Sequence, residues 1–304
     1  MNIQILIDSI CASGICQPTT LALGRSTTRS IAVDETNMYW VTNTTLNKVS
    51  AKGGSALAAI TPLASGLTEP QVVAAGGNAV LWTSYADSAN VGSVPKAGGP
   101  VVGIATGKSQ RPIGLAVDAN YAYWGPTTTD AVERVPLAGG SVVPVVSGAG
   151  APYRIALDST NIYWTERTNG LVVTALLGGG AGTPLATGQN SPAGIGAYAG
   201  HVYWATTTQS GSVTGMTADG RTSETIADGQ DYPYGVAADS SGIYWTNIGT
   251  GTPPSGAVLM RALNGGSVVL LASSQAGPSE IATNSNSVFW LNSATGVIMK
   301  VAKP

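Results

Sequence analysis

The chain of 304 residues contains few charged side chains, two cysteines and one histidine. Charged residues make up only 10% of it, which argues against long amphipathic helices with charged outer faces and against a basic surface for nucleic acid. No stretch approaches the roughly 18 apolar residues of a membrane-spanning helix. Residues 1–10 lack the basic start of a signal peptide. With so few cysteine and histidine side chains, we expect no metal site and no cofactor.

The two cysteines, Cys11 and Cys16, lie in the sequence CASGIC. A local disulfide between them would hold an N-terminal arm together and would fit an oxidising compartment. Two free thiols are the alternative, and the sequence leaves both open.

Seven tryptophans divide the chain into units of nearly equal length. Successive tryptophans are 42, 42, 40, 40, 41 and 45 residues apart, and a fixed period of this size is typical of β-propeller blades. Each follows a tyrosine, leucine or phenylalanine, in the pairs Tyr39-Trp40, Leu81-Trp82, Tyr123-Trp124, Tyr163-Trp164, Tyr203-Trp204, Tyr244-Trp245 and Phe289-Trp290. We therefore predict an all-β fold, a seven-bladed β-propeller of four-stranded antiparallel blades.

A second repeated position precedes each tryptophan by 12 residues. Thr28 occupies it in the first unit, and proline occupies it in the others: Pro70, Pro112, Pro152, Pro192, Pro233 and Pro278. The intervening segment has the same length in every unit, which predicts two strands joined by a tight hairpin. The length varies after the tryptophan, so we expect the variable loops on one face of the ring and the hairpins on the other.

The two ends of the chain predict how the ring closes. The last unit stops at Pro304 after its third strand, whereas TTLALG at residues 19–24 resembles the fourth strands of other units. We therefore expect the N-terminal segment to supply the outer strand of the last blade. Residues 1–18 then form an arm, and residues 19–304 form one propeller domain.

The Tyr-Trp pairs are explained by the geometry of a strand. Consecutive residues point to opposite faces, so the two aromatic side chains fill the spaces between one blade and its two neighbours. Half-exposed tryptophans stacking on sugar rings are the alternative. The aspartate that precedes tryptophan by six residues in several units is expected to cap the hairpin by accepting backbone amides, with calcium binding as the minor alternative.

The single histidine, His201, occupies a hairpin position that holds Asn37 and Asn161 in other units. We interpret it as a turn residue on the face opposite the variable loops. No Ser-His-Asp or Cys-His set accompanies it.

The segments Tyr163-Trp164-Thr165 and YWTN at 244–247 resemble those of YWTD-type and NHL-type propellers over residues 19–304. The chain departs from the YWTD pattern because the fourth position never holds aspartate and because it has seven units where that family has six. The CASGIC arm and the repeats are similar to secreted propeller proteins of myxobacteria, which implies a secreted or envelope-associated protein of undefined activity. Virginiamycin B lyases are also seven-bladed, but they rely on a histidine base and a metal, and His201 is in the wrong kind of place.

Ligands of propellers are generally bound at one end of the central channel, where the loops between blades meet the loops after the second strands. Here these loops differ from unit to unit, and their aromatic and polar side chains favour a carbohydrate or protein ligand. The candidate binding residues are Arg29, Gln71, Tyr85, Arg111, Tyr153, Arg154, Glu166, Tyr232, Tyr234 and Glu280. Two alternatives remain open: an enzyme using carboxylates such as Glu69 and Glu280 for acid–base chemistry, and a scaffold without a pocket. We expect a monomer that binds no nucleic acid and does not insert into a membrane.

Overall fold

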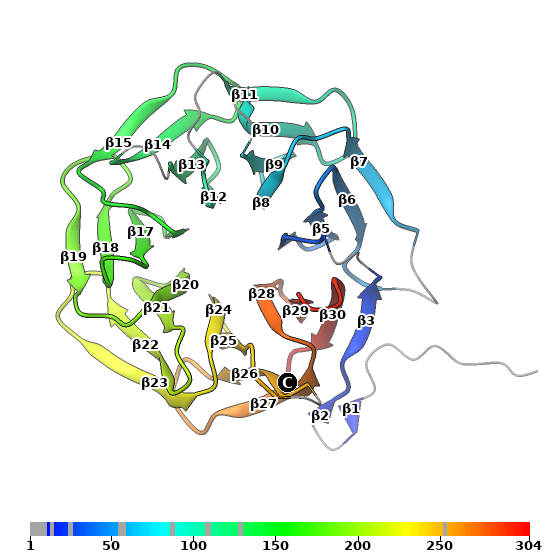
Figure 1. The fold of residues 1–304 in the computed structure, drawn as a ribbon, viewed down its shortest axis with the longest axis vertical. Helices are drawn as coiled ribbons and strands as arrows, with labels where there is room; N and C mark the ends of the chain where they lie inside the picture. The colour runs from blue at the N-terminus through cyan, green and yellow to red at the C-terminus, as the bar shows by residue number, and fades with distance from the viewer. Residues whose placement is uncertain are drawn as a thin grey trace, which may run out of the picture.

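The computed structural model describes residues 11–12, 15–23, 27–53, 59–85, 89–106, 111–126, 130–251 and 254–304. Seven four-stranded antiparallel sheets are arranged around a central axis (Figure 1). The prediction of a seven-bladed β-propeller is therefore confirmed. In the described ranges, no helix has the length and apolar character needed to cross a membrane.

Blades 1 to 6 are each built from four strands that follow one another along the chain, from the axis outward, and blade 7 begins in the same way. Blades 1 to 3 contain β4 (Ser30–Val33), β5 (Asn37–Val41), β6 (Thr45–Ser50) and β7 (Thr61–Ser65); β8 (Pro70–Gly76), β9 (Ala79–Ser84), β10 (Ala89–Pro95) and β11 (Val102–Thr106); and β12 (Gly114–Val117), β13 (Tyr121–Gly125), β14 (Ala131–Pro136) and β15 (Val143–Ser147). Blades 4 and 5 contain β16 (Arg154–Leu157), β17 (Asn161–Glu166), β18 (Leu171–Leu176) and β19 (Thr183–Ala186); and β20 (Pro192–Tyr198), β21 (His201–Thr206), β22 (Gly211–Thr217) and β23 (Ser223–Gln230). Blades 6 and 7 contain β24 (Pro233–Asp239), β25 (Gly242–Asn247), β26 (Gly256–Arg261) and β27 (Val269–Gln275); and β28 (Pro278–Thr283), β29 (Ser287–Asn292) and β30 (Val297–Ala302).

The fourth strand of blade 7 comes from the N-terminal end of the chain. Strand β3 (Thr19–Ala22) pairs antiparallel with β30, with Thr19 opposite Lys300, and Figure 1 shows blue β3 beside red β30. The predicted closure is confirmed, and it covers the outer edge of β30 with a paired strand.

A small hairpin precedes the ring. Strands β1 (Cys11–Ala12) and β2 (Ile15–Cys16) pair antiparallel, with Cys11 opposite Cys16. The side chains of both cysteines and all of residues 1–10 lie outside the described structure, so the disulfide stays a prediction.

The hydrophobic core is divided into seven clusters, and they join the aromatic residue or leucine of one blade to the tryptophan of the next. Tyr123 packs in one cluster with Trp164, and Tyr163 packs in another with Trp204. All seven tryptophans are at most 4% exposed, which rejects the alternative that they are open sugar-stacking surfaces. Burial of these large rings between blades supplies much of the apolar contact that holds the ring together.

The hairpin aspartates hold the tyrosines in place. Asp158 accepts the amides of Thr160 and Asn161 through Oδ1, and its Oδ2 accepts the Tyr163 hydroxyl at 2.6 Å. Asp34 and Asp118 bind Tyr39 and Tyr123 in the same way. The predicted capping role is confirmed, with the tyrosine hydroxyl as an additional donor.

The alternating strand directions give the ring two faces. The loops between blades and the loops after each second strand lie on one face, which we call the loop face. The hairpins between first and second strands lie at the other ends of these strands, on the hairpin face. In blade 5, for example, Pro192 pairs with Thr206 at the loop end of the ladder and Tyr198 pairs with His201 at the hairpin end.

Candidate functional site

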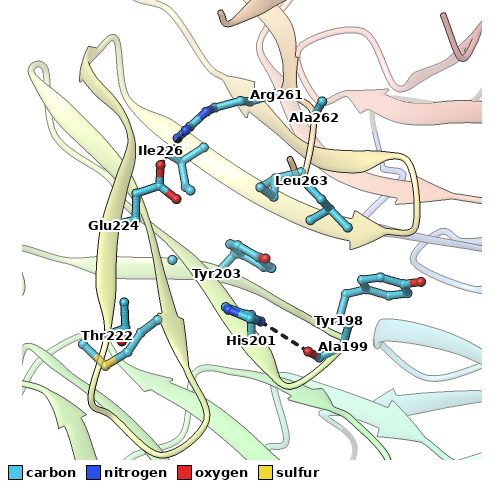
Figure 2. A pocket seen from close by; sticks show the side chains of 13 residues that line it. Tyr198, Ala199, His201, Tyr203, Thr222, Glu224, Ile226, Arg261, Ala262 and Leu263 are labelled. Atoms are coloured by element: carbon cyan, nitrogen blue, oxygen red, sulfur yellow. Dashed lines mark hydrogen bonds and ion pairs between the residues drawn. The ribbon is translucent and has the colours of Figure 1, made fainter. Parts of the chain in front are cut away.

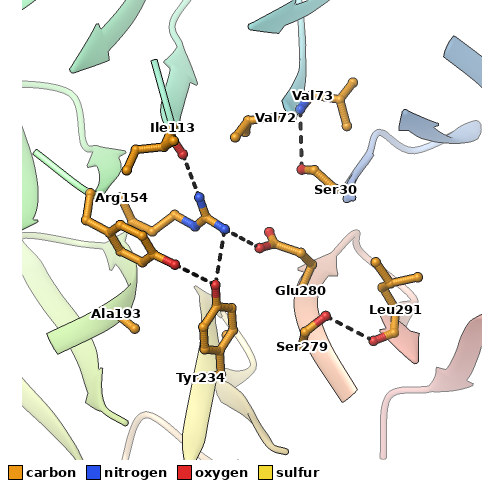
Figure 3. A network of polar contacts seen from close by, with 12 residues as sticks. Ser30, Val72, Val73, Ile113, Arg154, Ala193, Tyr234, Ser279, Glu280 and Leu291 are labelled. Carbon is orange, nitrogen blue, oxygen red and sulfur yellow. Dashed lines mark hydrogen bonds and ion pairs between the residues drawn. The ribbon is translucent and has the colours of Figure 1, made fainter. Parts of the chain in front are cut away.

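Arg154 lies at the start of β16 and reaches across the centre of the ring (Figure 3). Its Nη2 donates to Oε1 of Glu280 at 2.7 Å, and its Nη1 donates to the carbonyl oxygen of Ile113 at 2.5 Å. Arg154 belongs to blade 4, whereas Glu280 belongs to β28 of blade 7. A single ion pair therefore connects opposite sides of the channel, at a depth where both side chains are only about 20% exposed.

Two tyrosines extend this network toward the loop face. The hydroxyls of Tyr153 and Tyr234 lie 2.8 Å apart, and the guanidinium of Arg154 lies 5.0 Å from the centre of the Tyr153 ring. A cavity of about 150 Å³ adjoins the network and is lined by Arg154, Tyr234 and Glu280 together with residues of the inner strands. The structure therefore brings these four candidate residues together at the centre of the ring.

The charges in the network stabilise one another. Burial alone would lower the pKa of Arg154, but the Glu280 carboxylate and the phenols of Tyr234 and Tyr153 outweigh burial and raise it. Burial raises the pKa of Tyr234, and Arg154 opposes this effect only in part. The group at the centre of the channel is thus a guanidinium paired with a carboxylate and flanked by two tyrosine side chains.

A second group of candidates lies around Tyr85, at the rim of the mouth; by the mouth we mean the end of the central channel on the loop face. The guanidinium of Arg111 is 5.9 Å from the centre of the Tyr85 ring. Burial raises the pKa of Tyr85, while the charges of Arg154, Arg29 and Arg111 act in the opposite sense. Guanidinium groups from the first strands or entry loops of blades 1, 3 and 4 therefore lie near one phenol.

The remaining rim residues are arranged around this group. Arg29 donates from Nη1 to Oε1 of Gln71 and from Nε to Oδ1 of Asn43, at 3.0 Å each. Arg167, on the loop after β17, donates to Ser191 and lies over the Tyr153 ring, 5.4 Å from the ring centre. The acidic residues at 228 and 231 belong instead to the end of β23 and the loop that follows it, between blades 5 and 6. Arg29, Arg111 and Arg167 thus lie on the side of the mouth formed by blades 1 to 4, where the loops also carry Glu69 and Asp130.

The backbone before the anchor prolines is unusual. Glu69, Arg111 and Tyr232 take φ values of 46°, 44° and 54°, in the left-handed region that disfavours residues other than glycine. The carbonyls of Glu69 and Tyr232 accept the amides of Tyr85 and Ile248, at 3.1 and 3.0 Å. These hydrogen bonds help to compensate for the strain at Glu69 and Tyr232. They also hold the backbone in place, which fixes the direction in which the two side chains start.

One candidate, Glu166, lies apart from the others. It is 4% exposed in the wedge between blades, where Oε1 accepts the indole N–H of Trp164 at 3.1 Å and Oε2 accepts from Asn169. Its position two residues after tryptophan holds Asn247 and Asn292 in other blades, and these donate to the glutamines that bind the Trp245 and Trp290 indoles. This shared position was a signal that Glu166 serves the blade. The structure confirms that Arg167, on the loop that follows Glu166, lies at the mouth, and it adds the Ile113 carbonyl.

The remaining candidates for chemistry lie elsewhere. His201 lies at the hairpin end of β21, as predicted, on the face opposite the mouth. Among the described residues, no three histidine, cysteine, aspartate or glutamate side chains gather as metal ligands would. The mouth therefore offers fixed positive charge and phenol hydroxyls, which suit binding of a polar group.

No protein-family model and no curated protein matches the sequence. Solved structures do match it in fold. A streptogramin B lyase is 14% identical with a TM-score of 0.75, covering 94% of this chain and 97% of the lyase. The WD40 repeats of RRP9 are 12% identical with a TM-score of 0.75, covering 96% and 98% of the two chains. A structure of a nidogen/laminin complex contains a chain that is 21% identical with a TM-score of 0.57, covering 71% of this chain and 85% of that one. These similarities establish the propeller fold, which hosts both binding proteins and enzymes.

Proposed function

We propose that this chain is a binding protein whose loop face takes an acidic carbohydrate. The observation that carries the proposal is the convergence of Arg29, Arg111 and Arg154 on Tyr85, beside the phenols of Tyr153 and Tyr234. Guanidinium groups bind carboxylates through paired, charge-assisted hydrogen bonds. Tyrosine rings offer flat apolar surfaces with a polar end, which suit a sugar ring.

The residues of the mouth serve two roles in this proposal: some hold the site in shape, and others bind the ligand. Arg154 is already paired with Glu280, so it crosses the channel and orients the tyrosines. The side chains of Arg111 and Arg29 are exposed at the rim, so a ligand carboxylate would bind to them there, beside the contacts that both arginines already make. Gln71, which accepts from Arg29, would fix the direction of that guanidinium, and Tyr232 would border the ligand on the blade 6 side.

The test is a glycan array that contains uronate-bearing and neutral oligosaccharides, probed with the intact chain. We expect the intact chain to bind uronate-bearing glycans, and the double variant Arg29→Gln, Arg111→Gln to bind them at least about tenfold more weakly, because each charge-assisted hydrogen bond contributes roughly 1.5–3 kcal/mol. Arg221→Gln is the matched control, since it removes the same charge from the hairpin face. Equal binding by both variants, or binding only to neutral glycans, would overturn the proposal.

A protein partner is the second candidate, because one similar structure is a complex between nidogen and laminin. The arginines on the same side of the mouth would then bind acidic side chains. Association would be steered by charge and would slow as salt rises above about 0.1 M, where screening acts within roughly 10 Å. Among the described residues of the mouth, no contact favours an enzymatic role, since the one central carboxylate, Glu280, is paired with Arg154.

We further propose that the protein is a monomer that acts outside the cell or at the cell envelope. The proposed location rests on Cys11 and Cys16, which are opposite each other in the small N-terminal hairpin and would form a disulfide in an oxidising compartment. Thiol labelling of the denatured chain with and without reductant tests this: labelling that needs reductant supports it, and full labelling without reductant contradicts it. Sedimentation velocity tests the monomer.

A further inference from the structure

A cavity of about 230 Å³ opens on the hairpin face between blades 5 and 6, away from the mouth. Figure 2 shows Tyr203 at its centre, His201 and Tyr198 on one side, and the Glu224–Arg261 pair on the other. Ile226 and Ile243, both buried, form part of its wall. The cavity therefore combines aromatic, apolar and charged surfaces in a small volume.

The cavity exists because blade 5 departs from the repeat. On the third strand, the residue opposite the tyrosine is Arg134 in blade 3, and Arg134 crosses to the Leu177 carbonyl of the next blade at 2.7 Å. In blade 5 the corresponding residue is Gly215. A Cβ atom at Gly215 would lie 2.8 Å from the Tyr203 ring. The glycine therefore opens the space that a long side chain fills in blades 1, 3, 6 and 7, where the position holds Lys48, Arg134, Met260 and Lys300.

The hydroxyl of Tyr203 also lacks the partner that this position has in blades 1, 3 and 4, and among the described residues the Tyr244 hydroxyl of blade 6 has no partner either. In blades 1, 3 and 4 the tyrosine donates to an aspartate, but in blade 5 that position holds Tyr198. Tyr203 is only 6% exposed, it lines the cavity, and its hydroxyl makes no hydrogen bond to a described residue. The Tyr203 hydroxyl is therefore available to hydrogen-bond water or a ligand in the cavity.

The polar side of the cavity offers both donors and acceptors. Arg261 Nη2 donates to Oε1 of Glu224 at 2.5 Å, which leaves the second carboxylate oxygen for a ligand. His201 Nδ1 lies 3.2 Å from the Ala199 carbonyl, and a carbonyl can only accept, so this nitrogen carries the proton and Nε2 is an acceptor in the neutral ring. The imidazole lies nearly parallel to the Tyr203 ring, at 15° and 6.2 Å between centres.

We propose that this cavity binds one neutral sugar residue. Glu224 and Arg261 neutralise each other, so the cavity does not select a charged ligand. Sugar hydroxyls both donate and accept, as the groups from His201, Tyr203, Glu224 and Arg261 require, and the aromatic and apolar walls suit the C–H faces of a sugar ring. A cavity of about 230 Å³ has room for a single such ring. The site lies on the opposite face from the acidic-glycan site, and neither proposal depends on the other.

The test is isothermal titration calorimetry of the intact chain with the methyl glycosides of glucose, galactose and mannose, and with glucuronate and choline as charged probes. We expect at least one methyl glycoside to bind. The affinity should fall at least about tenfold in Glu224→Ala and in His201→Ala, and about fivefold in Tyr203→Phe, which loses one hydrogen bond. Asn161→Ala, at the hairpin position of blade 4 that corresponds to His201, is the matched control and should bind normally.

A second variant fills the cavity by adding a side chain at Gly215. Gly215→Thr gives blade 5 the residue that blade 4 carries as Thr174, and it should abolish glycoside binding; circular dichroism shows whether it folds. The proposal is overturned if no glycoside binds, if only a charged probe binds, or if the His201 and Glu224 variants bind as the intact chain does. The Arg29→Gln, Arg111→Gln variant should bind glycosides normally, which separates this site from the mouth.

Discussion

The interface between blades 3 and 4 and the interface between blades 5 and 6 are built from blades with the same strand order. They differ in the side chains that fill the space between the blades. In the former, Asp118 accepts the Tyr123 hydroxyl at 2.8 Å and Arg134 bridges to the next blade. In the latter, Tyr203 has no aspartate and Gly215 leaves a cavity. Residues common to most blades therefore hold the ring together. Departures from the repeat mark the places where side chains can serve a ligand.

The largest expected loss of stability comes from replacing a residue that is repeated in every blade. Trp164→Ala removes a fully buried ring between blades 3 and 4 and should lower the free energy of unfolding by about 3–5 kcal/mol, as large core truncations do. His201→Ala, at an exposed position that varies between blades, should change it by less than about 0.5 kcal/mol. Urea denaturation of the two variants measures both values, and similar losses would contradict the division between shared and departing residues.

A smaller difference in stability is expected when the tyrosines of blades 4 and 5 are each replaced by phenylalanine. Tyr163→Phe removes a 2.6 Å hydrogen bond to a carboxylate and should destabilise the chain by about 1.5–3 kcal/mol. Tyr203→Phe removes a hydroxyl that makes no hydrogen bond to a described residue, so it should be neutral or slightly stabilising. Thermal melts of the two variants make the measurement, and a larger loss in Tyr203→Phe would count against the account of blade 5.

The aspartate–tyrosine pairs also predict how stability depends on pH. Burial would raise the pKa of Asp158, but the Tyr163 hydroxyl and the amides of Thr160 and Asn161 lower it below the ordinary value of 3.8. This carboxylate therefore stabilises the fold above about pH 4, and its contribution is lost as the pH falls through the lowered pKa. The substitution Asp158→Asn should flatten the acid limb of a stability–pH curve, and an unchanged acid limb would refute this assignment.

The alkaline limb has the opposite sign. Burial and the neighbouring aspartate raise the pKa of Tyr123 from 10.0 to about 12. A raised pKa contributes stability that is complete below about pH 10 and is lost as the pH rises from there toward about 12. Tyr123→Phe should weaken this loss in urea denaturation between about pH 9 and 12, and an alkaline limb as steep as in the intact chain would contradict it.

The fold could be predicted from the sequence because its signals occur seven times. Trp164 belongs to a series with a period of 40 to 45 residues, Pro152 belongs to a series that precedes the tryptophans by 12 residues, and the strand alternation that buries the aromatic pairs is local. The pairing of Arg154 with Glu280 could not be predicted in the same way. The two residues are 126 positions apart, and their contact depends on how the ring turns between blades 4 and 7.

The sequence predicted which loops form the candidate site, but it did not predict the contacts between their side chains. The loop-face positions of Arg111 and Tyr153 follow from blade topology, but Glu166 turns into the wedge because its carboxylate accepts the Trp164 indole. Gly215 was overlooked because a single glycine among 40 gives no signal until its strand partner is known.

The most direct test of the central claim is the Nε–Hε spectrum of the arginine side chains during titration with glucuronate. If departures from the repeat at the mouth form a site for an acidic sugar, the signals of Arg29 and Arg111 should shift with a common dissociation constant, while those of Arg134 and Arg221 toward the hairpin face stay in place. Methyl glucoside should leave the signals of Arg29 and Arg111 unmoved. The claim is contradicted if glucuronate moves no arginine signal at the mouth, or moves those of the hairpin face equally.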